Sequence, residues 1–416
     1  MTSKFDICSL ITTYLDEGGK TVSDSGINSQ VRTGFNSTNE QEISAVYRIP
    51  PDATCEGVNL EWRDSNAARV EYYNGPNHKG DSNYLHKDTD FLISDVAVEL
   101  FGYLEAASRA DAIFTKHVNQ DAWNAVIPTE LHPEKPAWTR NLSSLKDALT
   151  SGQEYKILMM GDSTSCAPQN GCVEALVKRQ WPNSNIKFYL LWQNNSGCYH
   201  YAGLSTTNNK REFAESFDYS PYDLIIFSGI SQTRDSGPGG MPSEKPEYGI
   251  NTTNAVRMVM DMIRSDALGS RKNTHCQFLM MSSLLSVDSR GFGTSQGGGT
   301  YDNGWIDQQY YASDVQGFFE QVGKPCPVNT AWDIEKDIWA KRDYLPIREA
   351  MPEFCNDKGI PHWDFFPAAY QYLYRSGKYF QYYSRDAVHP NVWGYQVAAR
   401  LVFEAFKLVA EHDYSN

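Results

Sequence analysis

"ILMMGDSTSC", residues 157–166, is a run of four apolar residues that passes directly into Gly-Asp-Ser and further small polar residues. A short apolar run with an abrupt polar end is typical of a strand buried on both faces of a parallel sheet. Ser163 then has two interpretations. It belongs to an ordinary turn, or it is a nucleophile at the carboxyl end of the strand. The second interpretation requires a base and a carboxylate elsewhere in the chain.

The same pattern recurs along the second half of the chain. Further apolar runs lie at 186–192, 224–227, 278–281 and 360–366, and helical periodicity appears at about 171–181, 251–268, 309–322 and 332–355. After Pro390, the apolar residues that fall three or four positions apart are Trp393, Val397, Leu401, Ala405 and Leu408, which predicts a final amphipathic helix. Strands that alternate with helices predict an α/β fold with a parallel sheet.

The first 135 residues have a different pattern. Residues 44–51 and 57–75 alternate partly between apolar and polar, which predicts antiparallel strands, and 94–117 has helical periodicity. We therefore predict two units, a β-rich or α+β accessory unit over 1–135 and an α/β domain over 150–416. The polar, proline-containing stretch 129–144 is the predicted linker between them.

A base and an acid occur together near the end of the chain. In "SRDAVHPNVWGYQ" (384–396), Asp386 lies three residues before His389 at the entrance to the predicted final helix. In a compact turn, this spacing lets the carboxylate hold the Nδ1 side of the imidazole while Nε2 takes the proton of a serine. Ser163, His389 and Asp386 therefore form a candidate Ser-His-Asp triad. The alternatives are a turn or cap role for Ser163 and a salt-bridge role for Asp386.

These segments resemble a known group, the GDSL-like or SGNH hydrolase superfamily of esterases, lipases and carbohydrate deacetylases. "GDS" (161–163) matches its first block, "DAVHP" (386–390) matches its last, and the likeness covers about 150–410. The resemblance implies a flavodoxin-like three-layer α/β/α sandwich with Ser163 as nucleophile, His389 as base and Asp386 as its orienting partner. It also implies an oxyanion hole that uses the Ser163 backbone N–H, a glycine of the second block and an asparagine of the third.

The second and third blocks match less fully. "NNSGCYH" (194–200) fits the second block, with Gly197 as the glycine. The third block departs from the family's pattern, because "FSGISQTRD" (227–235) has Ser231 in place of the asparagine. The amide of Gln232 can donate in that role, and the Ser231 hydroxyl can donate more weakly. The loss of one such donor costs about 2.7–4 kcal/mol of transition-state stabilisation.

Three further residues are candidates for substrate binding. Asp162 adjoins the nucleophile, Gly229 matches the third block, and His200 follows Gly197 closely. The alternative for Asp162 is a structural role through hydrogen bonds within its loop. The alternative for His200 is an ordinary loop histidine.

Composition limits the partners and cofactors. The net charge of −14 disfavours nucleic acid, and the absence of any apolar run of membrane-spanning length predicts no membrane span. The cysteine spacing includes no CxxC pair, and the glycine-rich segments 234–249 and 289–305 lack phosphate-binding motifs, so we expect no metal and no cofactor. The amino terminus lacks the pattern of a signal peptide, which predicts an intracellular protein unless a leader has been removed.

Taken together, the motifs predict a serine esterase. Aromatic residues make up 13% of the chain, and Tyr and Trp suit clefts that bind sugars. The expected substrate is an O-acetyl or other short acyl ester on a carbohydrate or small metabolite. Two alternatives stay open at this point: an O-acyltransferase that uses the same triad, and a catalytically degenerate relative that binds carbohydrate. The oligomeric state is open.

Overall fold

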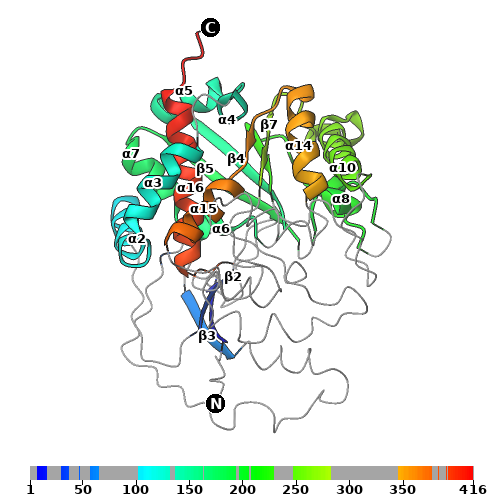
Figure 1. The fold of residues 1–416 in the computed structure, drawn as a ribbon. Helices are drawn as coiled ribbons and strands as arrows, with labels where there is room; N and C mark the ends of the chain where they lie inside the picture. The colour runs from blue at the N-terminus through cyan, green and yellow to red at the C-terminus, as the bar shows by residue number, and fades with distance from the viewer. Residues whose placement is uncertain are drawn as a thin grey trace, which may run out of the picture.

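A computed structural model gives the fold of the chain (Figure 1). It describes residues 7–15, 30–36, 46, 57–64, 102–131, 136–162, 164–193, 196–205, 208–228, 247–282, 345–376, 383, 390 and 392–415.

A parallel five-stranded sheet forms the centre of the second half, with strand order β5-β4-β6-β7-β8. The strands are β4 (Glu154–Gly161), β5 (Asn185–Trp192), β6 (Leu224–Phe227), β7 (Gln277–Met281) and β8 (His362–Trp363). Because β4 is the first of these five strands along the chain, their spatial order, renumbered from β4, is 2-1-3-4-5, the flavodoxin-like arrangement. Each of the five predicted apolar runs overlaps one of these strands, so the predicted fold class is confirmed.

This strand order creates a switch point beside β4. The chain leaves β4 to form β5 on one side and later returns to form β6 on the other side. In open α/β sheets, a crevice forms outside the carboxyl ends of the strands where the order reverses. The carboxyl end of β4 is Gly161, so the Gly-Asp-Ser segment begins at the position that this fold class uses for ligands.

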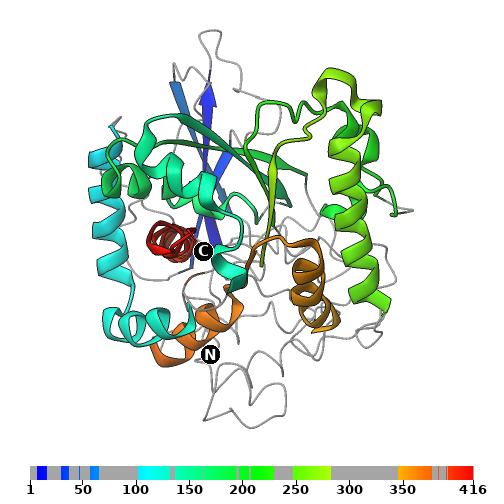
Figure 2. The same ribbon diagram turned by 90° about the horizontal axis from the view of Figure 1, so that it is seen from above.

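Helices cover both faces of the sheet (Figures 1 and 2). One face carries α5 (Ser143–Ser151), α7 (Val173–Gln180) and α16 (Val392–Glu411), and the other carries α10 (Glu247–Arg264) and α14 (Leu345–Lys358). The strand residues between these layers are buried, as in Leu158, Ile225 and Leu279, each 0% exposed. Burial on both faces explains why the strands appear in the sequence as continuous apolar runs.

The last helix, α16, is buried along most of its length. The predicted stripe is confirmed for Trp393, Val397, Leu401 and Ala405, which are buried, and Leu408 is partly buried. Polar residues of the first half of the helix are buried as well, including Gln396 and Arg400. The helix therefore lies inside the helical layer and does not cover it from outside, because further helices pack over it.

Those outer helices come from the predicted amino-terminal unit. Helices α2 (Tyr103–His117) and α3 (Gln120–Glu130) pack against α7, α16 and α15 (Phe366–Ser376). Phe114 and Trp123 join the same hydrophobic core as the sheet, and the Asn119 N–H donates to Tyr372 Oη at 3.1 Å. The division of the chain near residue 135 remains a prediction, but these two helices bury their apolar faces on the second half.

A small antiparallel sheet precedes these helices, with strand order β2-β1-β3. Its strands are β1 (Ile7–Leu15), β2 (Gln30–Asn36) and β3 (Gly57–Asp64). β3 confirms the first part of the strand predicted at 57–75, whereas of 44–51 only Val46 lies within the described residues. β2 contacts α16 (Figure 1).

The predicted linker at 129–144 is partly helical, and its role as a boundary between two units stays a prediction. It contains the end of α3, the short helix α4 (Pro136–Thr139) and the start of α5. Trp138 is 3% exposed, packs edge-on against Phe365 and accepts a hydrogen bond at its carbonyl oxygen from Trp363 Nε1 at 2.8 Å. The polar residues and prolines of this stretch suggested an exposed connection, but the side chain of Trp138 is buried in the core.

The remaining described elements are short. They are α6 (Ala167–Asn170), α8 (Cys198–Tyr201), α9 (Arg211–Ser216) and a 3-10 helix (Asp266–Arg271).

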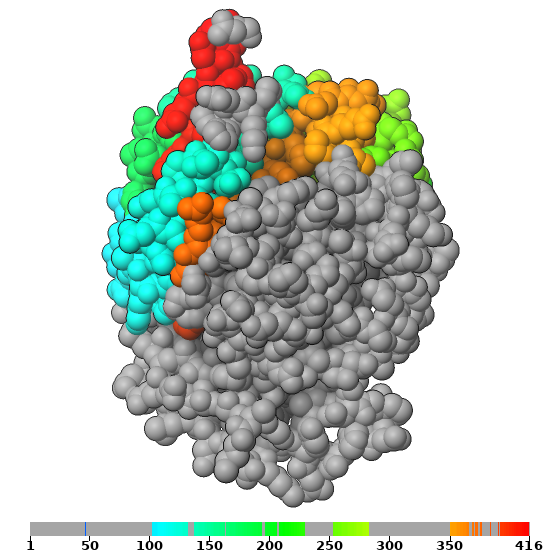
Figure 3. All heavy atoms as spheres, viewed as in Figure 1, coloured from blue at the N-terminus to red at the C-terminus, as the bar shows by residue number. Residues whose placement is uncertain are grey.

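The helix predicted at 309–322 lies outside the described residues, and the helix predicted at 332–355 is described from Leu345 onward, within α14. No described helix is long and apolar enough to cross a bilayer. In the space-filling view, α2 and α3 form the cyan part of the surface, beside the darker orange of α15 (Figure 3).

Candidate active site at the carboxyl edge of the sheet

Three chain segments meet at Gly161, the last residue of β4. The Gly161 carbonyl oxygen accepts a hydrogen bond from Tyr201 Oη at 2.7 Å, and the Ser228 N–H, directly after β6, donates to the Met160 carbonyl at 2.9 Å. A Cβ atom added to Gly161 would lie 1.9 Å from the Ser228 carbonyl oxygen and 2.1 Å from Ser165 Oγ. The loops after β4, β5 and β6 therefore pack so closely here that only glycine fits.

Asp162 forms the turn that follows Gly161. Its side chain is buried, and Oδ1 accepts hydrogen bonds from the Thr164 N–H at 2.8 Å and from Thr164 Oγ1 at 2.6 Å. The Ser165 N–H donates to the Asp162 carbonyl oxygen at 3.0 Å. Such bonds from an aspartate to the residues that follow it stabilise a tight turn. The geometry thus favours the structural alternative for Asp162.

The loop after β5 is fixed by the predicted second block. The Gly197 N–H donates to His200 Nδ1 at 3.0 Å, and the Gly197 carbonyl oxygen accepts from the N–H groups of His200 and Tyr201. Gly197 and His200 thus close the amino end of α8 reciprocally. His200 is 0% exposed, so its side chain faces the interior and does not lie on an open surface.

Tyr201 joins this loop to the end of β4. Burial, together with the nearby Asp162 carboxylate, raises the pKa of Tyr201 well above its ordinary value. The phenol therefore keeps its proton and donates to Gly161 over the ordinary pH range. No sequence signal pointed to Tyr201, because the contact joins residues 40 positions apart on different strands' loops.

The start of α16 packs against the residues that follow the Gly-Asp-Ser segment. A Cβ added to Gly171, just after α6, would lie 2.0 Å from the Tyr395 carbonyl oxygen. A Cβ added to Gly394 would lie 2.0 Å from the Tyr383 carbonyl oxygen and 2.9 Å from Pro390 Cβ. The Gly171 contact therefore links the end of α6 to the first turn of α16, and Gly394 packs that turn against Tyr383 and against Pro390, which directly follows His389 in sequence.

Several predicted site residues lie outside the described residues. These are Ser163, Asp386 and His389 of the triad and Gly229, Ser231 and Gln232 of the third block. Their described neighbours are Asp162 and Thr164, Pro390, and Ser228, respectively. The roles assigned to the six residues stay predictions.

The described cysteines supply no rival nucleophile. All five described cysteines are buried, namely Cys166, Cys172, Cys198, Cys276 and Cys355. Burial raises the pKa of Cys198, and it raises the pKa of Cys276 and of Cys355 to about 12. A thiol in that state is a poor nucleophile at neutral pH. Among the described residues, no three histidine, cysteine or acidic side chains are grouped as metal ligands.

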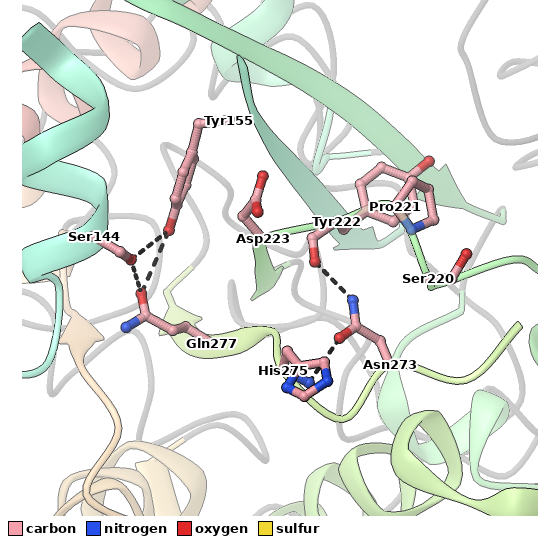
Figure 4. A pocket seen from close by; sticks show the side chains of 9 residues that line it. All are labelled: Ser144, Tyr155, Ser220, Pro221, Tyr222, Asp223, Asn273, His275 and Gln277. Carbon is pink, nitrogen blue, oxygen red and sulfur yellow. Dashed lines mark hydrogen bonds between the residues drawn. The ribbon is translucent and has the colours of Figure 1, made fainter. Parts of the chain in front are cut away.

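A cavity of about 320 Å³ lies at the opposite, amino edge of the sheet (Figure 4). Its wall includes Tyr155, Asp223 and Gln277, at or beside the starts of β4, β6 and β7. Ser144 Oγ hydrogen-bonds both Gln277 Oε1 and Tyr155 Oη, and Asp223 accepts from the Lys156 N–H at 2.7 Å. Ser144, Tyr155 and Gln277 thus pair with one another, and Asp223 pairs with the backbone of β4. Because the cavity lies at the edge opposite to the Gly-Asp-Ser segment, it is not the candidate active site.

Comparisons with known proteins give only distant likenesses. No protein-family model and no curated protein matches the chain. Among solved structures, a two-domain esterase (CEX) active on acetylated mannans is similar at a TM-score of 0.36 and 10% identity, over 66% of this chain and 54% of that one. The match thus spans about half the length of that esterase.

Two further solved structures are similar over most of their own length. One is LAE5, an alpha/beta hydrolase from the metagenome of Lake Arreo, Spain, with a TM-score of 0.34 and 12% identity over 62% of this chain and 98% of that one. The other is a carbohydrate acetylesterase family member from Sinorhizobium meliloti, with a TM-score of 0.34 and 10% identity over 62% and 100%. The function is therefore argued below from the residues of this chain.

Proposed function

We propose that this chain is a serine carboxylic ester hydrolase of the GDSL, or SGNH, type. Its proposed substrate is an O-acetyl or other short acyl ester on a carbohydrate or small metabolite. Ser163 is the proposed nucleophile, His389 the general base and Asp386 the acid that orients the imidazole.

The observation that carries the proposal is the position of the Gly-Asp-Ser segment. Gly161 ends β4 at the switch point of a 2-1-3-4-5 sheet and is packed against Ser228 and Tyr201 from the two neighbouring loops. A reactive serine next to this junction would be presented at the ligand-binding edge. The close contact of Gly171 supports the same proposal, because it ties α6 to the helix that follows His389-Pro390.

The proposed reaction has two steps. The Ser163 hydroxyl attacks the ester carbonyl while His389 Nε2 takes its proton, and the protonated imidazole then gives a proton to the departing alcohol. Water, deprotonated in turn by His389, attacks the acyl-enzyme and releases the free acid and Ser163. The Asp386 carboxylate stabilises the imidazolium that forms in both steps.

The proposed oxyanion hole combines three donors: the Ser163 N–H, the Gly197 N–H and a side chain of the third block, Gln232 or Ser231. Since the Gly197 N–H donates to His200 Nδ1 at 3.0 Å, it reaches an oxyanion only by turning away from the imidazole or by sharing its proton. A hydrogen bond to a charged oxygen is about twice as strong as one between neutral groups, so a developing oxyanion can compete for this donor.

Covalent labelling and hydrolysis together test the proposal. A fluorophosphonate probe should label the wild type, and the protein should release acetate from acetylated mono- and oligosaccharides. Ser163→Ala and His389→Ala should abolish labelling and lower kcat at least ~1,000-fold, whereas Ser108→Ala, at an exposed serine of α2, should change neither.

The outcomes separate the alternatives. Acyl transfer to an added sugar acceptor that exceeds release of the free acid would identify an acyltransferase. A well-folded wild type that is neither labelled nor able to cleave any ester would refute the proposed enzyme activity. The remaining alternative would then be a catalytically degenerate relative that binds carbohydrate.

A further inference from the structure

We propose that His200 is a positioning residue for the oxyanion hole and not a substrate contact. This inference rests on the proposed function. It goes further by assigning a role to a buried side chain that accepts a hydrogen bond from the Gly197 N–H. The role is to hold the Gly197 backbone, through its N–H, in a single resting conformation from which a small rotation turns that N–H toward an oxyanion.

The geometry requires a particular form of the imidazole. Because Nδ1 accepts the Gly197 N–H, that nitrogen carries no proton, so the neutral ring carries its proton on Nε2. The ring is 0% exposed, so its hydrogen bond with the Gly197 N–H is shielded from water. A neutral acceptor holds the Gly197 N–H less strongly than an oxyanion would. This hydrogen bond can therefore hold the loop in place and still let the Gly197 N–H move to the oxyanion.

Backbone hydrogen bonds of His200 hold its loop together. Its own N–H donates to the Gly197 carbonyl oxygen, and its carbonyl oxygen accepts from the N–H groups of Gly203 and Lys210 at 3.0 Å each. The next residue, Tyr201, reaches Gly161 at the end of β4. One residue thus connects the proposed oxyanion donor, the return of the loop toward α9, and the strand that leads to Ser163.

Glycine at 197 explains why such a clamp is needed. A glycine backbone samples more conformations than any other residue, so an unclamped Gly197 would spread its N–H over many directions. An oxyanion donor is most effective when little rearrangement separates its resting position from its position in the transition state. His200 removes that freedom in the resting protein, and the same glycine still allows the small rotation that moves the N–H to the oxyanion.

Two variants of His200 separate positioning from packing. His200→Asn places an amide oxygen close to the Nδ1 position and keeps an acceptor, whereas His200→Leu fills the space and removes it. We expect kcat to fall about 10- to 100-fold in His200→Leu with KM within about 2-fold of the wild type, and His200→Asn to recover most of kcat. Thermal unfolding of each variant reports whether it is folded.

A second measurement is independent of activity. Selective ¹⁵N labelling of histidine should show one ring with an unprotonated, hydrogen-bonded Nδ1 and a protonated Nε2, and this signal should vanish in His200→Asn. A protonated Nδ1 overturns the inference, as does a folded His200→Leu whose kcat equals or exceeds that of the wild type. An inactive wild type with the expected imidazole signal would instead count against the proposed function.

Discussion

At the scale of single residues, Gly161 is the position on which the candidate site depends most. Its Cα faces the Ser228 backbone, and its carbonyl oxygen receives the Tyr201 hydroxyl. The glycine is needed for space, since the three chain segments approach within contact distance of one another. A side chain here would push apart the loops that carry the proposed nucleophile and oxyanion donors.

Gly161→Ala should therefore damage both activity and stability. The added methyl group would lie 1.9 Å from a backbone oxygen that cannot move without shifting β6, so we expect a loss of about 1–3 kcal/mol of unfolding free energy. We expect esterase activity to fall at least ~100-fold, since misplacement of about 1 Å has that effect. Urea unfolding and ester hydrolysis measure the two changes.

Gly102 offers a matched control. It precedes α2 with φ −75°, and an added Cβ would meet nothing within 4 Å. Gly102→Ala should change the unfolding free energy by no more than about 0.5 kcal/mol and leave activity intact. Equal effects of the two substitutions would refute the assigned role of Gly161.

At the scale of elements, one acid holds three helices together. Asp111 of α2 hydrogen-bonds Arg179 of α7 and Arg400 of α16. Arg400 also lies over the Phe114 ring, with 4.9 Å between the guanidinium carbon and the ring centroid, and its side chain is only 10% exposed. Arg400 is the interior charge of α16, and Asp111 is the partner that neutralises it.

Asp111→Asn should destabilise the fold in a pH-dependent way. Burial by itself raises the pKa of Asp111, but the hydrogen bonds and charges of Arg179 and Arg400 outweigh it and lower the pKa overall. A lowered folded pKa contributes stability that is present above the unfolded value of about 3.9 and is lost as the pH falls through the folded pKa. We expect the variant to lose about 1–3 kcal/mol at pH 7, and the gap between wild type and variant to close below about pH 4.

Glu105 provides the control for this prediction. Glu105 pairs with Arg109 one turn along the same helix, and both side chains are 52% exposed. Glu105→Gln should cost less than about 0.5 kcal/mol at any pH, as exposed pairs do. Denaturant unfolding from pH 7 to pH 3 compares the two variants, and a gap at Asp111 that widens in acid would contradict the argument.

At the scale of the whole molecule, the packing of α2 and α3 bears on where the chain can be divided. Both helices share the core of the second half, and Asp111 and Asn119 bond to α16 and α15, respectively. A protein that begins after residue 135 would expose Phe114's and Trp123's packing partners and leave Arg400 without its acid. The sheet and its helices therefore need α2 and α3 as a cover.

Two truncations test this dependence. A chain of residues 136–416 should lose cooperative unfolding and bind ANS through exposed apolar surface. A chain of residues 102–416 keeps both helices and should keep a cooperative transition. Its midpoint should be lower, because Val46 is buried in the core and its carbonyl oxygen accepts from Cys172 Sγ at 3.2 Å. Cooperative folding of 136–416 with full stability would show that the boundary lies where the sequence predicted it.

The sequence by itself determined the sheet, because strands that are buried on both faces consist of short, continuous runs of apolar residues. It also predicted the last helix and drew attention to Gly-Asp-Ser at the end of β4 and to the second block around Gly197. These features are local: each depends on a few neighbouring residues, whose order can be read directly.

The tertiary structure alone decided the features that join residues far apart in the sequence. Trp138 makes a core segment out of an apparent linker, and Tyr201 meets Gly161 across 40 positions. His200 is a wholly buried acceptor, whereas the sequence offered it as a substrate contact or as an ordinary loop histidine. Periodicity describes which face of one element is apolar, but it carries no information about which element packs on that face or which buried polar atoms pair there.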